Sequence, residues 1–139
     1  MTQINCKIVK ETDATAILAL YRQAGWWSTE DKDSDLEIIT KIVANSFCFV
    51  IATLDDQIVG MGRALSDGIS DAYIQDVTVQ KEFRGQGIGK TIIRTLVSFL
   101  KEHKLQWIGL ICEPGYEGFY QGLGFKEMVS YTPFLLSEI

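Results

Sequence analysis

A glycine-rich turn constrains this chain more than any other feature. Residues 84–90 (RGQGIGK) follow a predicted strand over residues 72–79 and lead into a predicted helix over residues 90–103. The first N–H groups of a helix lack partners within the helix, and the helix dipole adds positive potential there. Glycines remove side chains that would keep a phosphate away from these N–H groups. The turn therefore predicts a site for a phosphorylated ligand.

Two common nucleotide-binding motifs do not match this turn. The dinucleotide fingerprint needs the spacing G-x-G-x-x-G and an acidic residue about 20 positions later. Here the glycines stand at every second position, and Gln106 and Trp107 occupy the place of the acid. The P-loop needs a glycine five positions before its Gly-Lys-Thr, and that position is Arg84. The phosphorylated ligand is therefore expected to belong to another class.

The pattern that does fit is Arg-x-x-Gly-x-Gly, formed by Arg84, Gly87 and Gly89 after residues 76–83 (DVTVQKEF). It resembles the acyl-CoA signature of the GNAT superfamily of N-acetyltransferases. Residues 119–125 (FYQGLGF) resemble a later part of the same family pattern, a Tyr four residues before Gly-Phe. Two motifs in this order are more specific than either alone, and the resemblance extends from about residue 47 to 126.

The resemblance implies that acetyl-CoA is the co-substrate. In GNAT enzymes the strand before the turn splays from the next strand, and the pantetheine arm enters the gap between them. The residues expected to contact acetyl-CoA are Val77, Thr78 and Val79 for pantetheine, and Arg84, Gly85, Gln86, Gly87, Ile88, Gly89 and Lys90 for the pyrophosphate. No metal is expected, because the chain has one His and no close pair of cysteines.

Acetyl transfer needs a base for the amine and an acid for the departing thiolate. Tyr120 matches the family's usual general acid, although it could instead simply pack its short helix. Asp76 and Glu113 are the candidate bases. The alternatives are a structural Asp76 at a strand bulge and a chain of water molecules that accepts the proton. Cys112 is expected to be a small buried residue, because family members usually transfer the acetyl group directly.

The acceptor is expected near two adjacent tryptophans, Trp26 and Trp27, which stand where GNAT proteins often build the acceptor wall. Tyr73, with Met61 and Phe134, would complete an aromatic pocket for an amine. An alternative is that the tryptophans only close the junction between a helix and the following loop.

Composition sets broader limits. With 139 residues, 47% of them hydrophobic, the chain is expected to form one domain over residues 1–139. A net charge of −5 disfavours nucleic acid as a partner. No signal segment begins the chain, no apolar run reaches membrane-spanning length, and the three cysteines are scattered. A cytoplasmic protein is therefore expected, without a membrane partner.

The order of the elements predicts an α/β fold. Hairpins followed by a strand–helix–strand unit indicate a mixed sheet with helices on both faces. With the family resemblance, this implies a GNAT-like mixed, mostly antiparallel sheet of six to seven strands, with about four helices on both faces. The helices are expected at residues 13–23, 35–44, 90–103 and 116–121. Residues 125–130 and 132–136 are expected to be closing strands, through which a homodimer would form.

The function predicted from the sequence is transfer of an acetyl group from acetyl-CoA to a primary amine. The expected acceptor is a small molecule, an amine or an amino-acid derivative, which attacks directly in a ternary complex. Two alternatives remain open. One is a non-catalytic acyl-CoA-binding sensor or interaction module, and the other is an N-acetyltransferase of peptides or proteins.

Overall fold

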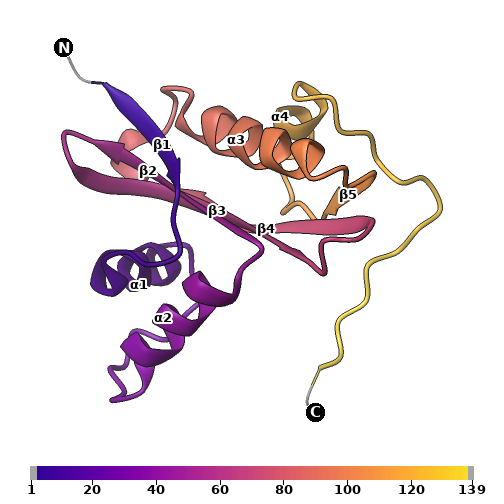
Figure 1. The fold of residues 1–139 in the computed structure, drawn as a ribbon. Helices are drawn as coiled ribbons and strands as arrows, with labels where there is room; N and C mark the ends of the chain where they lie inside the picture. Colours follow the sequence, from indigo (N-terminus) through magenta and orange to yellow (C-terminus); the bar gives the residue numbers. More distant parts are fainter. Residues whose placement is uncertain (1–2, 138–139) are drawn as a thin grey trace.

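A five-stranded mixed sheet organises residues 3–137, the part of the chain that the computed structural model describes (Figure 1). Its strands lie in the order of the sequence. They are β1 (Ile4–Ile8), β2 (Cys48–Leu54), β3 (Gln57–Ser66), β4 (Asp71–Val79) and β5 (Trp107–Leu110). The three pairs formed among β1 to β4 are antiparallel, and β5 runs parallel to β4. The predicted mixed and mostly antiparallel sheet is therefore confirmed.

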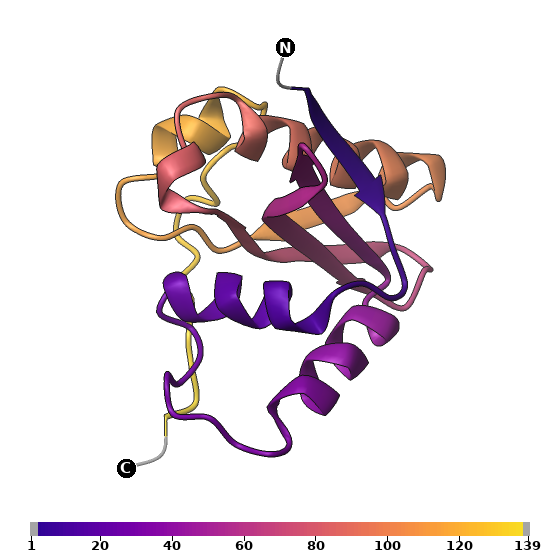
Figure 2. The same cartoon turned by 90° about the vertical axis from the view of Figure 1, so that its left-hand side faces the viewer.

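Helices cover both faces of this sheet, as the sequence predicts (Figures 1 and 2). One face carries α1 (Ala14–Gln23) and α2 (Asp35–Asn45), and the other carries α3 (Ile88–Glu102) and α4 (Glu117–Gln121). A short 3-10 turn, η1 (Lys81–Phe83), joins β4 to the glycine-rich turn. Within residues 3–137, no helix has the length and apolar content needed to cross a membrane.

The core has two halves, one on each side of the sheet. Under α1 and α2, fully buried Ile17 and Ile39 pack with Phe49 of β2. Under α3, the helix residues Ile92 and Leu96 pack against the strands. Helix α3 lies close to β3, because a Cβ added to Gly62 would stand 2.8 Å from a side-chain carbon of Ile92. Only glycine leaves room for that approach.

A bulge in β4 lies opposite this glycine. The pairing of β3 with β4 shifts between Met61↔Thr78 and Arg63↔Gln75, so that the bulged strand holds an extra residue. Asp76 lies in the bulge with a φ of 59°, in the left-handed region that Asp tolerates better than most residues. Its carboxylate Oδ2 accepts hydrogen bonds from the Tyr21 hydroxyl at 2.7 Å and from Arg63 Nε at 2.6 Å. One carboxylate thus ties α1 and β3 to the bulge.

The predicted closing strands at residues 125–130 and 132–136 are wrong. Residues 3–137 contain five strands and not six or seven, and residues 125–137 follow α4 as an extended segment without strand pairing. Aromatic and β-branched residues such as Val129, Tyr131 and Thr132 favour a strand there, but a strand needs an edge to pair with. Within the described chain this segment has no such partner, and Phe134 is 93% exposed.

Replacement of Asp76 tests the role of its carboxylate. Asp76→Ala should lower the free energy of unfolding by about 2–3 kcal/mol, because Arg63 and Tyr21 lose a partly buried acceptor. Asp76→Asn keeps a side-chain oxygen and should cost roughly half as much. Urea unfolding followed by circular dichroism measures both values.

Asp56 provides the matched control, because it has a φ of 65° but is exposed and its side chain has no hydrogen-bond partner among the described residues. Asp56→Ala reports the backbone strain alone. A loss as large in Asp56→Ala as in Asp76→Ala would show that the carboxylate contributes nothing.

Candidate active site

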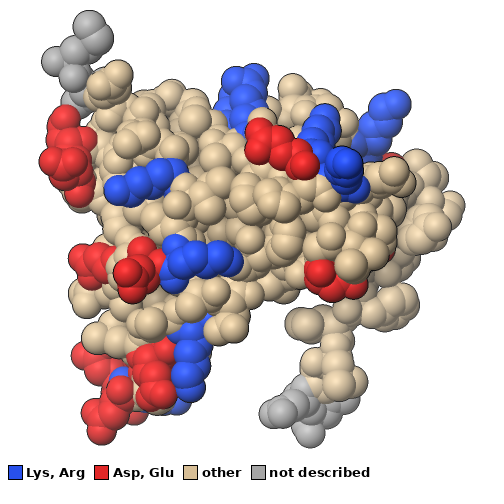
Figure 3. All heavy atoms as spheres, in the orientation of Figure 1, with Lys and Arg blue, Asp and Glu red and all other residues tan. Residues whose placement is uncertain are grey.

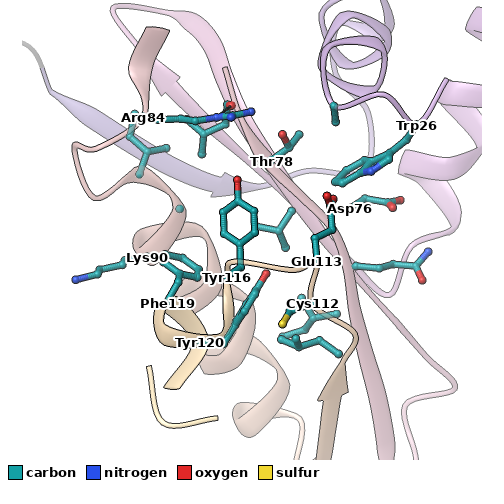
Figure 4. Close-up of a pocket in the computed structure, with 18 of the residues that line it drawn as sticks. Trp26, Asp76, Thr78, Arg84, Lys90, Cys112, Glu113, Tyr116, Phe119 and Tyr120 are labelled. Carbon is teal, nitrogen blue, oxygen red and sulfur yellow. Dashed lines mark hydrogen bonds between the residues drawn. The ribbon is translucent and has the colours of Figure 1, made fainter. Parts of the chain in front are cut away.

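A cavity of about 820 Å³ runs along the second half of β4. Its walls come from the end of α1, the glycine-rich turn, the segment after β5, and α4. In Figure 4, Arg84 and Lys90 lie on one side of the view, and Trp26, Asp76 and Glu113 lie on the other. Tyr116 and Tyr120 stand between these groups. The cavity thus brings together residues from five separate parts of the fold.

The cavity exists because β4 and β5 separate. The two strands pair only from Asp71↔Trp107 to Ile74↔Leu110, where β5 ends. Residues 75–79 continue along the cavity without a neighbouring strand on that side. Their backbone groups on this edge are therefore available to a ligand that can hydrogen bond as a strand does. This is the split that the family resemblance implies.

The glycine-rich turn forms one end of the cavity. None of the six successive N–H groups of residues 85–90 has a hydrogen-bond partner within residues 3–137. Gly85 and Gly87 have φ values of 81° and 83°, and a Cβ at either would meet no atom within 4 Å. The side chain of Arg84 braces the turn, because its Nε donates to the carbonyl of Val79 at 2.9 Å.

These observations fit a pyrophosphate group. Phosphate oxygens accept hydrogen bonds, and this end supplies free backbone donors, the start of α3, and the cations Arg84 and Lys90. The residues predicted to contact the pyrophosphate line the cavity, except for Gln86. Gln86 lies outside the lining, but its backbone N–H group is free. Val77, Thr78 and Val79 line the middle of the cavity. Among the described residues, no three potential metal ligands lie together.

Tyr120 and Cys112 mark the other end of the β4 edge. Tyr120 lies on α4, with its ring against Phe119 at 5.0 Å and Phe125 at 5.8 Å between centroids. Burial raises the pKa of Tyr120 to about 12, and negative charge on Cys112 or Glu113 adds to this shift. Burial also raises the pKa of the Cys112 thiol. At neutral pH both groups are protonated, so Tyr120 can donate a proton and Cys112 is a weak nucleophile.

The two candidate bases have different surroundings. Asp76 lines the cavity, but its carboxylate is engaged by Tyr21 and Arg63, which supports the structural role for this residue. Glu113 also lines the cavity and is exposed. Its carboxylate makes no hydrogen bond or ion pair within the described chain, so it is the freer of the two to accept a proton or hold a cation.

The structure separates the aromatic residues that the sequence places together. Trp26 lines the cavity at the end of α1 and is 40% exposed. Trp27 lies outside the lining and packs against Tyr21. Tyr73 is also outside the lining, with its ring 5.0 Å from that of Trp107. Met61 is fully buried in the core, so it does not reach the cavity either.

A hydrogen-bond network holds the loop that carries Trp26. Buried Asp35 accepts bonds from Trp27 Nε1 and Arg22 Nη2, each at 3.2 Å, and from the N–H of Lys32 at 2.9 Å. The bond from the Lys32 N–H is the main reason that the pKa of Asp35 lies below its ordinary value. Asp35 thus joins the end of α1, the loop and the start of α2.

Sequence reasoning missed several residues of the cavity. Gln23, Ala24 and Gln75 line it, but no motif marks them, because their position depends on how α1 crosses the sheet. Tyr116 also lines the cavity. An aromatic residue four positions before Tyr120, on the same side of a short helix, was the one available signal for it.

Comparison with known proteins shows the family to which this chain belongs. The chain belongs to the acetyltransferase (GNAT) family, which it matches over residues 12–125. It is 38% identical over 71 residues to the uncharacterized N-acetyltransferase ycf52 of Pyropia yezoensis. That match covers 51% of this chain and 41% of the relative, so the chain matches less than half the length of this relative.

Solved structures share the fold over nearly the whole chain. A GNAT family acetyltransferase from Streptococcus pneumoniae superimposes with a TM-score of 0.79 over 99% of this chain and 98% of its own, at 25% identity. An aminoglycoside N-acetyltransferase solved in complex with CoA gives a TM-score of 0.78 over 100% and 97%, at 18% identity. At that identity the second likeness concerns the fold alone.

Gly87→Ala tests the phosphate end of the cavity. The added methyl group enters the open space in front of the free N–H groups, and alanine is strained at a φ of 83°. The dissociation constant of acetyl-CoA, measured by calorimetry, should rise about 10-fold or more. Gly68→Ala imposes a similar backbone strain at a φ of 82° outside the cavity lining, together with a 3.2 Å approach to the ring of Phe47. It should leave the dissociation constant unchanged. Equal affinities in all three proteins would contradict the assignment.

Proposed function

We propose that this protein is an acetyl-CoA-dependent N-acetyltransferase that acts on a primary amine by direct attack in a ternary complex. One observation carries the proposal: a single cavity joins a turn with six free N–H groups to a protonated phenol, along an unpaired strand edge. Family membership supports the same activity.

Different residues along the cavity would bind different parts of acetyl-CoA. The turn at residues 85–90 would hold the pyrophosphate, and the edge of β4 at residues 77–79 would hold the amides of pantetheine. When bound, acetyl-CoA supplies a thioester that an amine can attack. The backbone edge and the turn fix its orientation, which lowers the entropic part of the barrier.

Tyr120 is the general acid in this proposal. Its pKa of about 12 keeps the hydroxyl protonated, so it can donate to the sulfur as the C–S bond breaks. Before the C–N bond forms, the acceptor must lose a proton from its ammonium group. Glu113 is the free carboxylate at this end of the cavity and can accept that proton, directly or through water.

The acceptor that fits best is a small amine that is cationic in solution. Trp26 and Glu113 both line the acceptor side, so an aromatic face and a negative charge meet there. Both attract an ammonium group. Figure 3 shows further acidic side chains where Figure 1 places α2, but basic side chains lie among them, and Asp31 and Glu37 are paired with Arg22 and Lys41.

Tyr120→Phe tests the general acid. The variant should lower kcat about 100-fold, because the thiolate loses its proton donor, and should change the KM of acetyl-CoA by less than about 2-fold. Release of free thiol, measured over a panel of primary amines, gives both constants. Tyr116→Phe, which removes another hydroxyl from the same cavity wall, should retain most of the activity.

Two outcomes would reject parts of this proposal. A wild-type rate in Tyr120→Phe removes the assigned acid. Tight acetyl-CoA binding by the unaltered protein, without thiol release for any amine or peptide, instead favours a binding module.

The pH profile gives an independent check on Tyr120. Ionisation of the phenol would remove the proton donor and lower the rate, but a pKa of about 12 places that loss above the usual assay range. The rate should therefore rise with pH as the amine loses its proton, and then level off without falling between about pH 8 and 10. A decline in this range that Tyr120→Phe abolishes would contradict the raised pKa.

A further inference from the structure

Tyr116 is the most exposed aromatic residue that lines the cavity. It precedes Tyr120 by one helical turn, and 47% of its surface is exposed. Its hydroxyl makes no hydrogen bond within residues 3–137. Phe119 and Tyr120, by contrast, pack against the core and against each other, with 5.0 Å between their ring centroids. The ring of Tyr116 therefore points into the cavity without filling any part of the core.

A tight turn fixes the backbone that carries this ring. Residues 113–116 (EPGY) have Pro and Gly at the two central positions of a type II turn, and the N–H of Tyr116 donates to the carbonyl of Glu113 at 3.2 Å. Gly115 has the positive φ that this turn needs, 94°, and its N–H donates to Oε1 of Glu117 at 2.7 Å. The backbone of Tyr116 is thus held in place, while its exposed side chain can change rotamer.

The ring stands where the arm of acetyl-CoA would pass. In Figure 4, Tyr116 lies between Arg84 on the phosphate side and Asp76 on the acceptor side, and its side chain is directed toward β4 near Thr78. Under the proposed function, pantetheine runs along the edge of β4 from the glycine-rich turn to Tyr120. The edge forms one side of this path. Tyr116 comes from the start of α4, so it forms the opposite side.

The chemistry of the arm suits an aromatic cover. Its amides can pair with the open backbone groups of residues 77–79, as a strand does. Between the pyrophosphate and the first amide, the arm carries a carbon with two methyl groups, which cannot hydrogen bond. An aromatic ring can bury these methyl groups and leave the amides free to pair with the strand. Trp26, the other exposed aromatic residue of the lining, lies with Asp76 on the acceptor side.

We propose that Tyr116 covers the pantetheine arm, so that the arm lies between this ring and the edge of β4, with the thioester held near Tyr120. The inference rests on the proposed function, because it takes acetyl-CoA as the ligand of the cavity. The contact uses the ring and not the hydroxyl, so phenylalanine can replace tyrosine here. Because the ring turns aside to admit the arm and then closes over it, the cover acts mainly on the rate of dissociation.

Three ligands, studied by calorimetry, test the cover. In Tyr116→Ala the dissociation constants of acetyl-CoA and of S-acetylpantetheine should both rise about 10-fold, because both ligands contain the arm. S-acetylpantetheine is measured by its competition with acetyl-CoA. The dissociation constant of 3′-phosphoadenosine 5′-diphosphate, which has the phosphates of CoA but no arm, should not change. Tyr116→Phe should bind all three ligands within about 2-fold of the unaltered protein.

Tyr131→Ala is the matched control. Tyr131 is 77% exposed and lies outside the cavity lining, so its loss should change none of the three constants. Circular dichroism verifies that both alanine variants are folded. Unchanged affinity of Tyr116→Ala for S-acetylpantetheine overturns the proposal, as does the absence of any competition by this ligand. Tighter binding of acetyl-CoA by Tyr116→Ala also overturns it, because the ring would then obstruct the arm.

The same measurements separate this inference from the proposed function. Gly87→Ala should show the opposite pattern, with weaker binding of acetyl-CoA and of 3′-phosphoadenosine 5′-diphosphate and unchanged binding of S-acetylpantetheine. If the unaltered protein binds none of the three ligands, the proposed function fails and the cover fails with it. If it binds all three, and Tyr116→Ala does the same with equal affinities, the cover alone fails.

Discussion

The carboxylate of Asp76 is the contact on which the cavity depends. It accepts bonds from Tyr21 on α1 and from Arg63 on β3, and it holds β4 in a bulged conformation. Bulges bend a strand and redirect the residues that follow. Those residues form the open edge along the cavity, and α1 leads directly to Trp26. The two bonds that one carboxylate accepts therefore link the open edge of β4 to the cavity wall at Trp26.

The two ends of the cavity have opposite polarity. At one end, free N–H groups, Arg84 and Lys90 attract anions. At the other, Glu113 is an unpaired carboxylate near Trp26. A ligand with phosphates at one end and an amine partner at the other is oriented by this difference before it makes any specific contact. The raised pKa of Tyr120 belongs to the same arrangement, because burial and nearby negative charge both disfavour the phenolate.

Local signals in the sequence predicted the turn and helix at the glycine-rich end of the cavity, because these features lie close together along the chain. The glycines at positions 85, 87 and 89 mark the turn, and the apolar spacing of α3 marks the helix that follows. The helix begins at Ile88, two residues before the predicted start, because Gly87 at a φ of 83° takes the capping position. Such details follow from backbone geometry that residue types only partly encode.

The end of the cavity near Trp26 depends on contacts between residues that are far apart in the sequence, so sequence patterns predicted its side chains less well. The sequence gives no reason to place one of the adjacent residues Trp26 and Trp27 in the cavity rather than the other. In the structure, the hydrogen bond from Trp27 Nε1 to Asp35 holds the side chain of Trp27 outside the cavity lining. Tyr73 faces the opposite side of the sheet from Ile74 because strand residues alternate. The two predicted closing strands were wrong because a strand forms only by pairing with another strand, and the sequence does not show which strand edge is available for pairing.

The network around Asp35 has a consequence for how such a protein can change over time. Arg22, Trp27 and Lys32 hold the loop between α1 and α2 through their bonds to Asp35, which itself makes no hydrogen bond to the glycine-rich turn or to β4 within residues 3–137. A substitution at Trp26, which lines the cavity and is 40% exposed, would leave these three bonds in place. Under the proposed function, a lineage could thus vary its acceptors at this wall and retain the loop that carries it.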